Sequence, residues 1–135
     1  MRDNRAFLDS NVCLYLLSED SPKKEKAEDL LALPDSVISL RVLNENINVA
    51  IKKLKLSQSK IIGHIDFLIL SCELVGFSIA LQREAIELHF RYHFSFYDSL
   101  IIAAALHANC TILYSEDMQH GLVIENKLSI VNPFI

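Results

Sequence analysis

The chain has 135 residues, of which 51% are hydrophobic and 22% charged, and its formal net charge is −4. This length suits one domain with a sizeable core, and the apolar content excludes a globally disordered chain. The acidic balance lacks the broad basic surface of a duplex-DNA binder, although it is compatible with a nuclease that touches a few phosphates.

The first half of the chain begins with a short apolar run at residues 6–8, which we interpret as a strand. It ends at the carboxylate of Asp9 and is followed by a helical run at residues 12–17. Ser21 and Pro22 predict a second helix over residues 23–33, with Ser21 as N-cap and Pro22 in the first helical position. The β-branched run at residues 36–40 predicts a second strand. Residues 41–54 repeat apolar side chains at helical spacing, and Glu45 lies in the first turns of this helix.

The second half alternates in the same way. Residues 56–72 predict a helix capped by Ser57 or Ser59, followed by a third strand at residues 76–80 and a helix over residues 81–92. Ser95 and Asp98 precede the most apolar helix, over residues 99–108, which we expect at the centre of the fold. The clearest strand is at residues 110–114, and two weaker ones follow at residues 122–124 and 128–131.

Strands that alternate with helices predict an α/β fold. We expect a single domain over residues 1–135 with three layers, α/β/α, in which helices cover both faces of a central, mostly parallel sheet of four or five strands. The longest apolar runs fall short of the roughly 20 residues that a membrane span needs. Residues 1–5 lead directly into the first strand without a signal-peptide core, so we expect a cytoplasmic protein. The cysteines, odd in number and in apolar segments, predict buried thiols at Cys13, Cys72 and Cys110.

Four carboxylates are predicted to meet at one edge of this sheet, although they are far apart in the sequence. Asp9 ends the first strand, Glu45 and Asp98 lie near the starts of helices, and Asp117 follows the strand at residues 110–114. In such a fold the carboxyl ends of the strands and the N-termini of the helices share one edge, where ligands bind. Two unit charges ~4 Å apart repel by about 4 kcal/mol at an effective dielectric constant of about 20, so protons or cations must compensate such a cluster.

An oxygen-only site without Cys or His suits Mg²⁺ or Mn²⁺ rather than zinc. Two such ions would balance four carboxylates, activate water, and stabilise the attacking and leaving oxygens of an in-line phosphoryl displacement. The chemistry that this pattern indicates is therefore phosphodiester hydrolysis.

Each acid also has a purely structural interpretation. Asp9 could cap the first helix, Asp98 could complete a capping box with Ser95, Asp117 could be a turn residue, and Glu45 could be a solvated helix acid. We favour the joint interpretation because the separate ones require four acids to reach one edge by accident.

Four segments carry a more specific pattern: residues 7–12 (FLDSNV), 42–45 (VLNE), 95–101 (SFYDSLI) and 112–121 (ILYSEDMQHG). In the first, Asn11 stands two residues after Asp9. In the last, Ser115 stands two residues before Asp117. In this order and spacing the segments resemble the PIN domain family, and in particular the VapC-type toxins of bacterial toxin–antitoxin modules. The resemblance spans nearly the whole chain.

The resemblance implies a PIN-like domain and a Mg²⁺-dependent endoribonuclease, with Mn²⁺ as a possible substitute, that hydrolyses RNA by metal-activated water and is restrained by a cognate antitoxin. Its catalytic and metal-binding acids would be Asp9, Glu45, Asp98 and Asp117. Asn11 and Ser115 would be supporting residues that orient the acids or the attacking water. Glu116 is the alternative to Asp117 as the fourth metal-facing acid, and we favour Asp117 because of its distance from Ser115.

The family also suggests a homodimer, and the apolar helix faces within residues 12–33 and 41–54 are candidate sites for the antitoxin. Near Asp98, Phe94, Phe96 and Tyr97 could contact RNA bases, although the first two are more simply core residues. Lys23 is expected on a solvated helix face.

Three other functions fit the sequence less well. A phosphatase of the haloacid-dehalogenase type also begins with a strand that ends in Asp, but it needs a second Asp where this chain has Asn11. With three glycines in the chain, neither a dinucleotide-binding loop nor a P-loop can be built. The remaining alternative is a catalytically silent PIN-like module that binds protein or RNA, and the presence of all four acids disfavours it.

Overall fold

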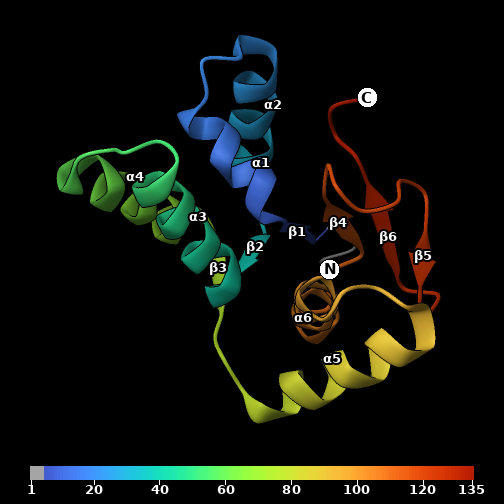
Figure 1. Cartoon of the computed structure of the whole chain (residues 1–135). Helices are drawn as coiled ribbons and strands as arrows, with labels where there is room; N and C mark the ends of the chain where they lie inside the picture. Colours follow the sequence, from blue (N-terminus) through green and yellow to red (C-terminus); the bar gives the residue numbers. More distant parts are fainter. Residues whose placement is uncertain (1–4) are drawn as a thin grey trace.

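A computed structural model describes residues 5–135 and contains a six-stranded sheet in the order β3-β2-β1-β4-β6-β5 (Figure 1). The strands are β1 (Ala6–Leu8), β2 (Ser36–Ser39), β3 (Glu73–Val75), β4 (Ile112–Tyr114), β5 (Val123–Ile124) and β6 (Leu128–Val131). All neighbouring strands pair in parallel except β5 with β6. The predicted α/β fold with a mostly parallel sheet is confirmed. The sheet has six strands rather than four or five, because both of the weaker strands predicted near the C-terminus, β5 and β6, join it.

The helices are α1 (Ser10–Leu14), α2 (Ser21–Ala32), α3 (Leu40–Lys52), α4 (Gln58–Ser71), α5 (Ile79–Tyr92) and α6 (Phe96–His107), with a 3₁₀ turn, η1 (Tyr15–Leu17), after α1. Figure 1 shows α5 and α6 on one side of the sheet and α1 and α2 on the other, while α3 and α4 lie near its β2–β3 end. Within residues 5–135, no helix has both the length and the apolar character that crossing a membrane requires.

Two local predictions were wrong. The strand expected at residues 76–80 lies at Glu73–Val75, because the Ser78 hydroxyl accepts a hydrogen bond of 3.1 Å from the Leu81 N–H and starts α5 at Ile79. The N-cap of α2 is Asp20 rather than Ser21, since its carboxylate accepts from the Lys23 N–H at 3.3 Å. Neither difference changes the order of the elements.

The core lies between the sheet and the helices. The central strands bury Phe7, Leu8, Val37, Ile38, Leu113 and Ile130 completely or nearly so. In α6 every residue from 101 to 105 is buried, which confirms the central position expected for this helix. The three cysteines are free thiols, of which Cys13 and Cys110 are buried and Cys72 is half-buried.

One polar group in the core was not predicted. Asn46 of α3 is fully buried, and its amide donates to the carbonyls of Val42 at 3.0 Å and Ser10 at 3.3 Å. Its oxygen lies 2.8 Å from Nε2 of His64 in α4, which is itself buried. Because burial lowers the pKa of His64, the ring is neutral and donates through Nε2 to the Asn46 oxygen. These bonds join α1, α3 and α4 directly beside Asp9.

Candidate active site

The carboxyl edge of the sheet holds a small pocket of about 160 Å³, and all four predicted acids line it. Asp9 follows β1, Glu45 lies in α3, Asp98 is in the first turn of α6, and Asp117 follows β4. We call this the acid pocket. Parallel pairing of β1 with both β2 and β4 brings these segments together, because it aligns the ends of the three strands.

Asp9 is the most enclosed of the four acids, with 8% of its surface exposed. One carboxylate oxygen accepts from the Ser10 N–H at 2.7 Å, and the other accepts from the Ser115 hydroxyl at 2.8 Å. Burial raises the pKa of Asp9 to about 6. The hydrogen bonds from Ser115 and Ser10 oppose this shift, and the charges of Glu45 and Asp98 add to it. Asp9 is also the N-cap of α1, so it both caps this helix and lines the acid pocket.

Asp98 is half-buried at the start of α6, where its N–H donates to the Ser95 hydroxyl at 3.1 Å. Burial raises the pKa of Asp98, and the charge of Asp117 raises it further. A hydrogen bond with Ser95 and the charge of Arg41 act in the opposite direction. Ser95 is thus the N-cap of α6, and Asp98 lies in the acid pocket.

The two supporting residues contact two different acids. Ser115 is fully buried and donates to Asp9. The Asn11 amide donates to Asp117 at 2.9 Å, and its oxygen accepts from the Glu116 N–H at 3.4 Å. Each supporting side chain therefore restricts the orientation of one pocket carboxylate.

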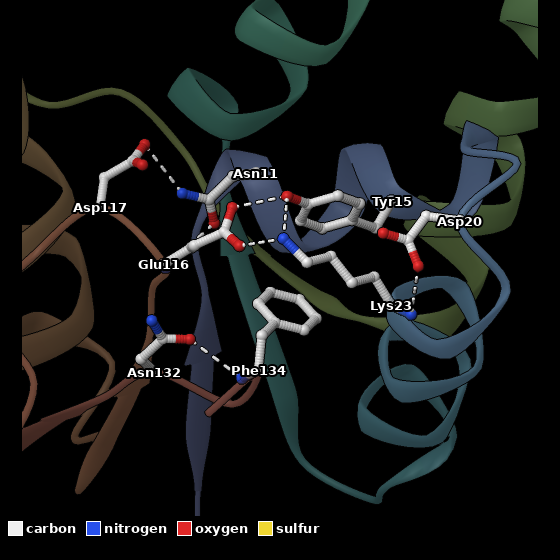
Figure 2. Close-up of polar contacts among 8 residues, drawn as sticks. All are labelled: Asn11, Tyr15, Asp20, Lys23, Glu116, Asp117, Asn132 and Phe134. Atoms are coloured by element: carbon white, nitrogen blue, oxygen red, sulfur yellow. Dashed lines mark hydrogen bonds and ion pairs between the residues drawn. The ribbon is translucent and has the colours of Figure 1, made fainter.

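Glu116 and Asp117 point in different directions (Figure 2). Asp117 lines the acid pocket, whereas Glu116 bonds to Lys23 and Tyr15 outside it. Although partial burial opposes it, the hydrogen bonds from Lys23 and Tyr15 lower the pKa of Glu116. Of the two candidates for the fourth acid, Asp117 therefore has the position that a cation in the pocket would require.

Two residues at the site, Arg41 and Ser10, were missed in the sequence, and the contact of a third, Lys23, was not predicted. Arg41 forms an ion pair of 3.1 Å with Glu45, and its guanidinium lies 4.0 Å from the ring centre of Tyr97, which lines the pocket. The spacing of four between Arg41 and Glu45 on one helix is a signal that could have identified this pair. Ser10 also lines the pocket, and its buried hydroxyl has no hydrogen-bond partner within the described residues. Lys23, expected to be solvated, bonds to Glu116 instead.

The residues that line the acid pocket offer oxygen atoms and one side-chain amide as possible metal ligands, and none of them is His or Cys. Over residues 5–135, no three His, Cys, Asp or Glu side chains are close enough together to hold a metal ion. The four carboxylates thus share one pocket without forming a closed set of ligands.

Comparisons with known proteins agree with this fold. The model of the PIN domain family matches residues 6–122. A Mycobacterium tuberculosis structure, VapC20, described as a toxin that cleaves the sarcin–ricin loop, has a TM-score of 0.67 and 18% identity, covering 83% of this chain and 89% of that one. A toxin–antitoxin complex from Klebsiella pneumoniae has a TM-score of 0.71 and 20% identity, covering 95% and 97%.

A third similar structure is VapBC2 from Rickettsia felis, described as bound to a DNA fragment from its promoter. It has a TM-score of 0.63 and 21% identity, and the match covers 83% of this chain and 87% of that one. Among curated proteins, no sequence matches significantly. At these identities the structural matches show a shared fold.

Proposed function

Because the chain belongs to the PIN domain family, we propose that it is a metal-dependent endoribonuclease and the toxin of a toxin–antitoxin module. The observation that carries this proposal is the acid pocket, where four carboxylates from four separate elements meet at the carboxyl edge of the sheet. The similar structures, a toxin that cleaves the sarcin–ricin loop and two toxin–antitoxin assemblies, support the same function.

The residues of the acid pocket fit Mg²⁺ or Mn²⁺. Carboxylate oxygens are the ligands that these ions prefer, and the raised pKa of Asp9 reflects a buried group whose negative charge the protein leaves uncompensated. Because the carboxylates are spread around the pocket wall, we expect binding to draw Asp9, Asp98 and Asp117 together, with Glu45 at the margin. A divalent cation bound there would polarise a phosphate and activate water for its attack on phosphorus.

The neighbouring residues of the chain would orient the carboxylates that hold this cation. Ser115 and the Ser10 N–H hold both oxygens of Asp9, so this carboxylate is oriented before a cation arrives. Asn11 does the same for Asp117. These hydrogen bonds limit the directions of the two carboxylates before cation binding draws the acids together.

Incubation of the purified protein with a structured RNA tests this function. We expect discrete cuts in the presence of Mg²⁺ or Mn²⁺ and no cutting after chelation with EDTA, with activity restored by added cation. Sequencing of the RNA ends would map the sites. Absence of both cleavage and metal binding would favour the alternative, a catalytically silent module that binds RNA or protein.

An antitoxin is the proposed protein partner, and a homodimer is the proposed assembly. Expression with and without the neighbouring open reading frame tests the partner, because a toxin should inhibit growth when it is expressed alone. We expect co-purification of the second protein and relief of the inhibition. Unimpaired growth without it, together with no co-purified protein, would contradict the toxin assignment.

Tyr97 is expected to contact the RNA at the rim of the acid pocket. The residue is 57% exposed, and the Arg41 guanidinium lies over its ring. Since stacking of a base on an aromatic ring is worth about 1–3 kcal/mol, Tyr97→Ala should raise KM on the order of tenfold with little change in kcat. Phe90→Ala is the control, because Phe90 is also an exposed aromatic residue but lies outside the pocket. An unchanged KM in Tyr97→Ala would contradict this contact.

A further inference from the structure

A lysine of α2, Lys23, contacts the segment that follows β4. Three successive side chains of this segment have different partners: Ser115 bonds to Asp9, Glu116 to Lys23 and Tyr15, and Asp117 to Asn11. Figure 2 shows Glu116 directed towards Lys23 and Tyr15, while Asp117 meets the Asn11 amide. Because Glu116 and Asp117 are consecutive residues, the contacts that hold Glu116 also restrict the backbone that carries Asp117.

Three side chains from different parts of the chain surround the Lys23 ammonium, and together with it they form what we call the Lys23 cluster: Lys23, Tyr15, Glu116 and Phe134. Nζ of Lys23 lies 2.6 Å from a Glu116 oxygen and 3.0 Å from the Tyr15 hydroxyl, which itself donates to the other Glu116 oxygen at 2.6 Å. Nζ also lies 4.8 Å and 5.5 Å from the ring centres of Tyr15 and Phe134. The two rings meet edge to face at 4.9 Å, so the cation has a closely defined position.

Asn11 connects this cluster to the acid pocket. Its oxygen accepts from the Glu116 N–H, and its amide nitrogen donates to Asp117. Asn11 and Tyr15 are four residues apart in the continuous α1–η1 segment, so both hold the loop from the same support. If Glu116 moved, Asp117 would move with it, and the hydrogen bond from the Asn11 amide to Asp117 would be lengthened or lost.

We propose that Lys23, Tyr15 and Glu116 are positioning residues that hold the 115–117 segment so that Asp117 faces the cation site of the acid pocket. None of the three lines the pocket itself. The inference rests on the proposed function, since it assigns these residues a role in binding that cation. It extends the site to a contact between α2 and the loop after β4, two segments that are 93 positions apart in the sequence.

Positioning and simple electrostatics predict opposite results when the Lys23 charge is removed. If Lys23 acted only through its charge, its loss would make the surroundings of the pocket more negative and would tighten cation binding. If it positions the loop, its loss frees Glu116 and Asp117 and weakens binding. Loss of a partner in the outer shell of a metal site typically costs about 10- to 100-fold in affinity or activity.

The experiment is a Mn²⁺ titration of the full chain monitored by electron paramagnetic resonance. The kcat and KM for RNA cleavage are measured in parallel. Lys23→Met should raise the Kd for Mn²⁺ about tenfold and lower kcat, with KM for RNA unchanged. Tyr15→Phe should give a smaller change in the same direction. Lys23→Arg, which retains a donor and a charge opposite Glu116, should restore most of the affinity.

A second cluster, which also joins a cation, a tyrosine and a glutamate, provides the matched control. Arg91 pairs with Glu125, and the Tyr92 hydroxyl donates to the same carboxylate at 2.7 Å. These residues join the end of α5 to the turn between β5 and β6 and do not line the acid pocket. Arg91→Met removes a cation from a comparable ion pair and should leave the Kd for Mn²⁺ unchanged.

The outcomes separate this inference from the proposed function. Wild-type protein that binds Mn²⁺ and cuts RNA, together with unchanged or tighter binding in Lys23→Met and Tyr15→Phe, would overturn the positioning role alone. An equal loss of affinity in Arg91→Met would also overturn it. Wild-type protein that neither binds Mn²⁺ nor cuts RNA would overturn the proposed function and this inference together. Thermal unfolding of each variant shows that the titrated protein is folded.

Discussion

Asp9→Asn and Asp98→Asn are each expected to reduce RNA cleavage by about a thousandfold or more while the fold is retained. Stabilisation of the transition state by a bound cation is worth several kcal/mol, and each ~1.36 kcal/mol is a factor of ten in rate. An amide keeps the size of the carboxylate but loses the charge that would hold the cation. Asp9 should be the more sensitive of the two because it is the more deeply buried.

The measurement is single-turnover cleavage of a structured RNA at saturating Mg²⁺, with circular dichroism to verify folding. Asp29→Asn is the matched control, since Asp29 is an exposed acid on α2 that does not line the acid pocket. Undiminished cleavage by both Asp9→Asn and Asp98→Asn would refute the site assignment, whereas loss in Asp29→Asn would show that the assay responds to unspecific changes of charge.

The second large effect concerns stability: without metal, Asp9→Asn should be more stable than the wild-type protein at neutral pH. The pKa of Asp9 is raised from 3.8 to about 6 in the folded state. Between these values the folded protein binds more protons than the unfolded chain, so the contribution of this group to stability falls as the pH rises through this range. Above about pH 6 the penalty is complete. Its upper bound is about 3 kcal/mol, because each pH unit between the two pKa values corresponds to about 1.36 kcal/mol.

Urea unfolding in EDTA measures this prediction. The free energy of unfolding of Asp9→Asn should exceed that of the wild-type protein by about 1–3 kcal/mol near neutral pH, and the difference should vanish near pH 4. Added Mg²⁺ should stabilise the wild-type protein and have little effect on the variant, because a ligand stabilises only the state that binds it. If Asp9→Asn were more stable than the wild-type protein by the same amount at both pH values, the charge of Asp9 would not be the source of the difference in stability.

Both predictions concern the same carboxylate, whose buried charge lowers the stability of the fold when no metal is bound. Asp9 is enclosed beside Glu45 and Asp98, an arrangement that destabilises its charged form until a cation compensates it. The Ser115 and Ser10 bonds partly offset this cost and also fix the direction of the carboxylate. The same variant that abolishes the chemistry should therefore remove the destabilising buried charge.

The amino-acid sequence by itself determined the order of strands and helices and the meeting of the four acids at one pocket. Both follow from short-range signals. Apolar periodicity marks α3, a nearly continuous apolar run marks α6, and a short apolar run ending in Asp9 marks β1. In a parallel α/β fold the ends of neighbouring strands must share an edge. The start of α5 was misplaced because a hydroxyl that caps a helix cannot be distinguished locally from a residue in a short strand.

Only the tertiary structure decided how the acids are supported. The choice between Glu116 and Asp117 depends on Lys23 and Tyr15, which approach from α2 and η1, and no spacing within the loop reveals them. The buried contact between Asn46 and His64 likewise joins helices whose packing is set by the whole core. The physical reason is that direction and burial of a side chain are properties of its three-dimensional neighbours, whereas helix and strand patterns are properties of a few consecutive residues. The four acids and the supporting residues Asn11 and Ser115 were predicted from the sequence, but the acid that each supports and the contacts of Lys23 were not.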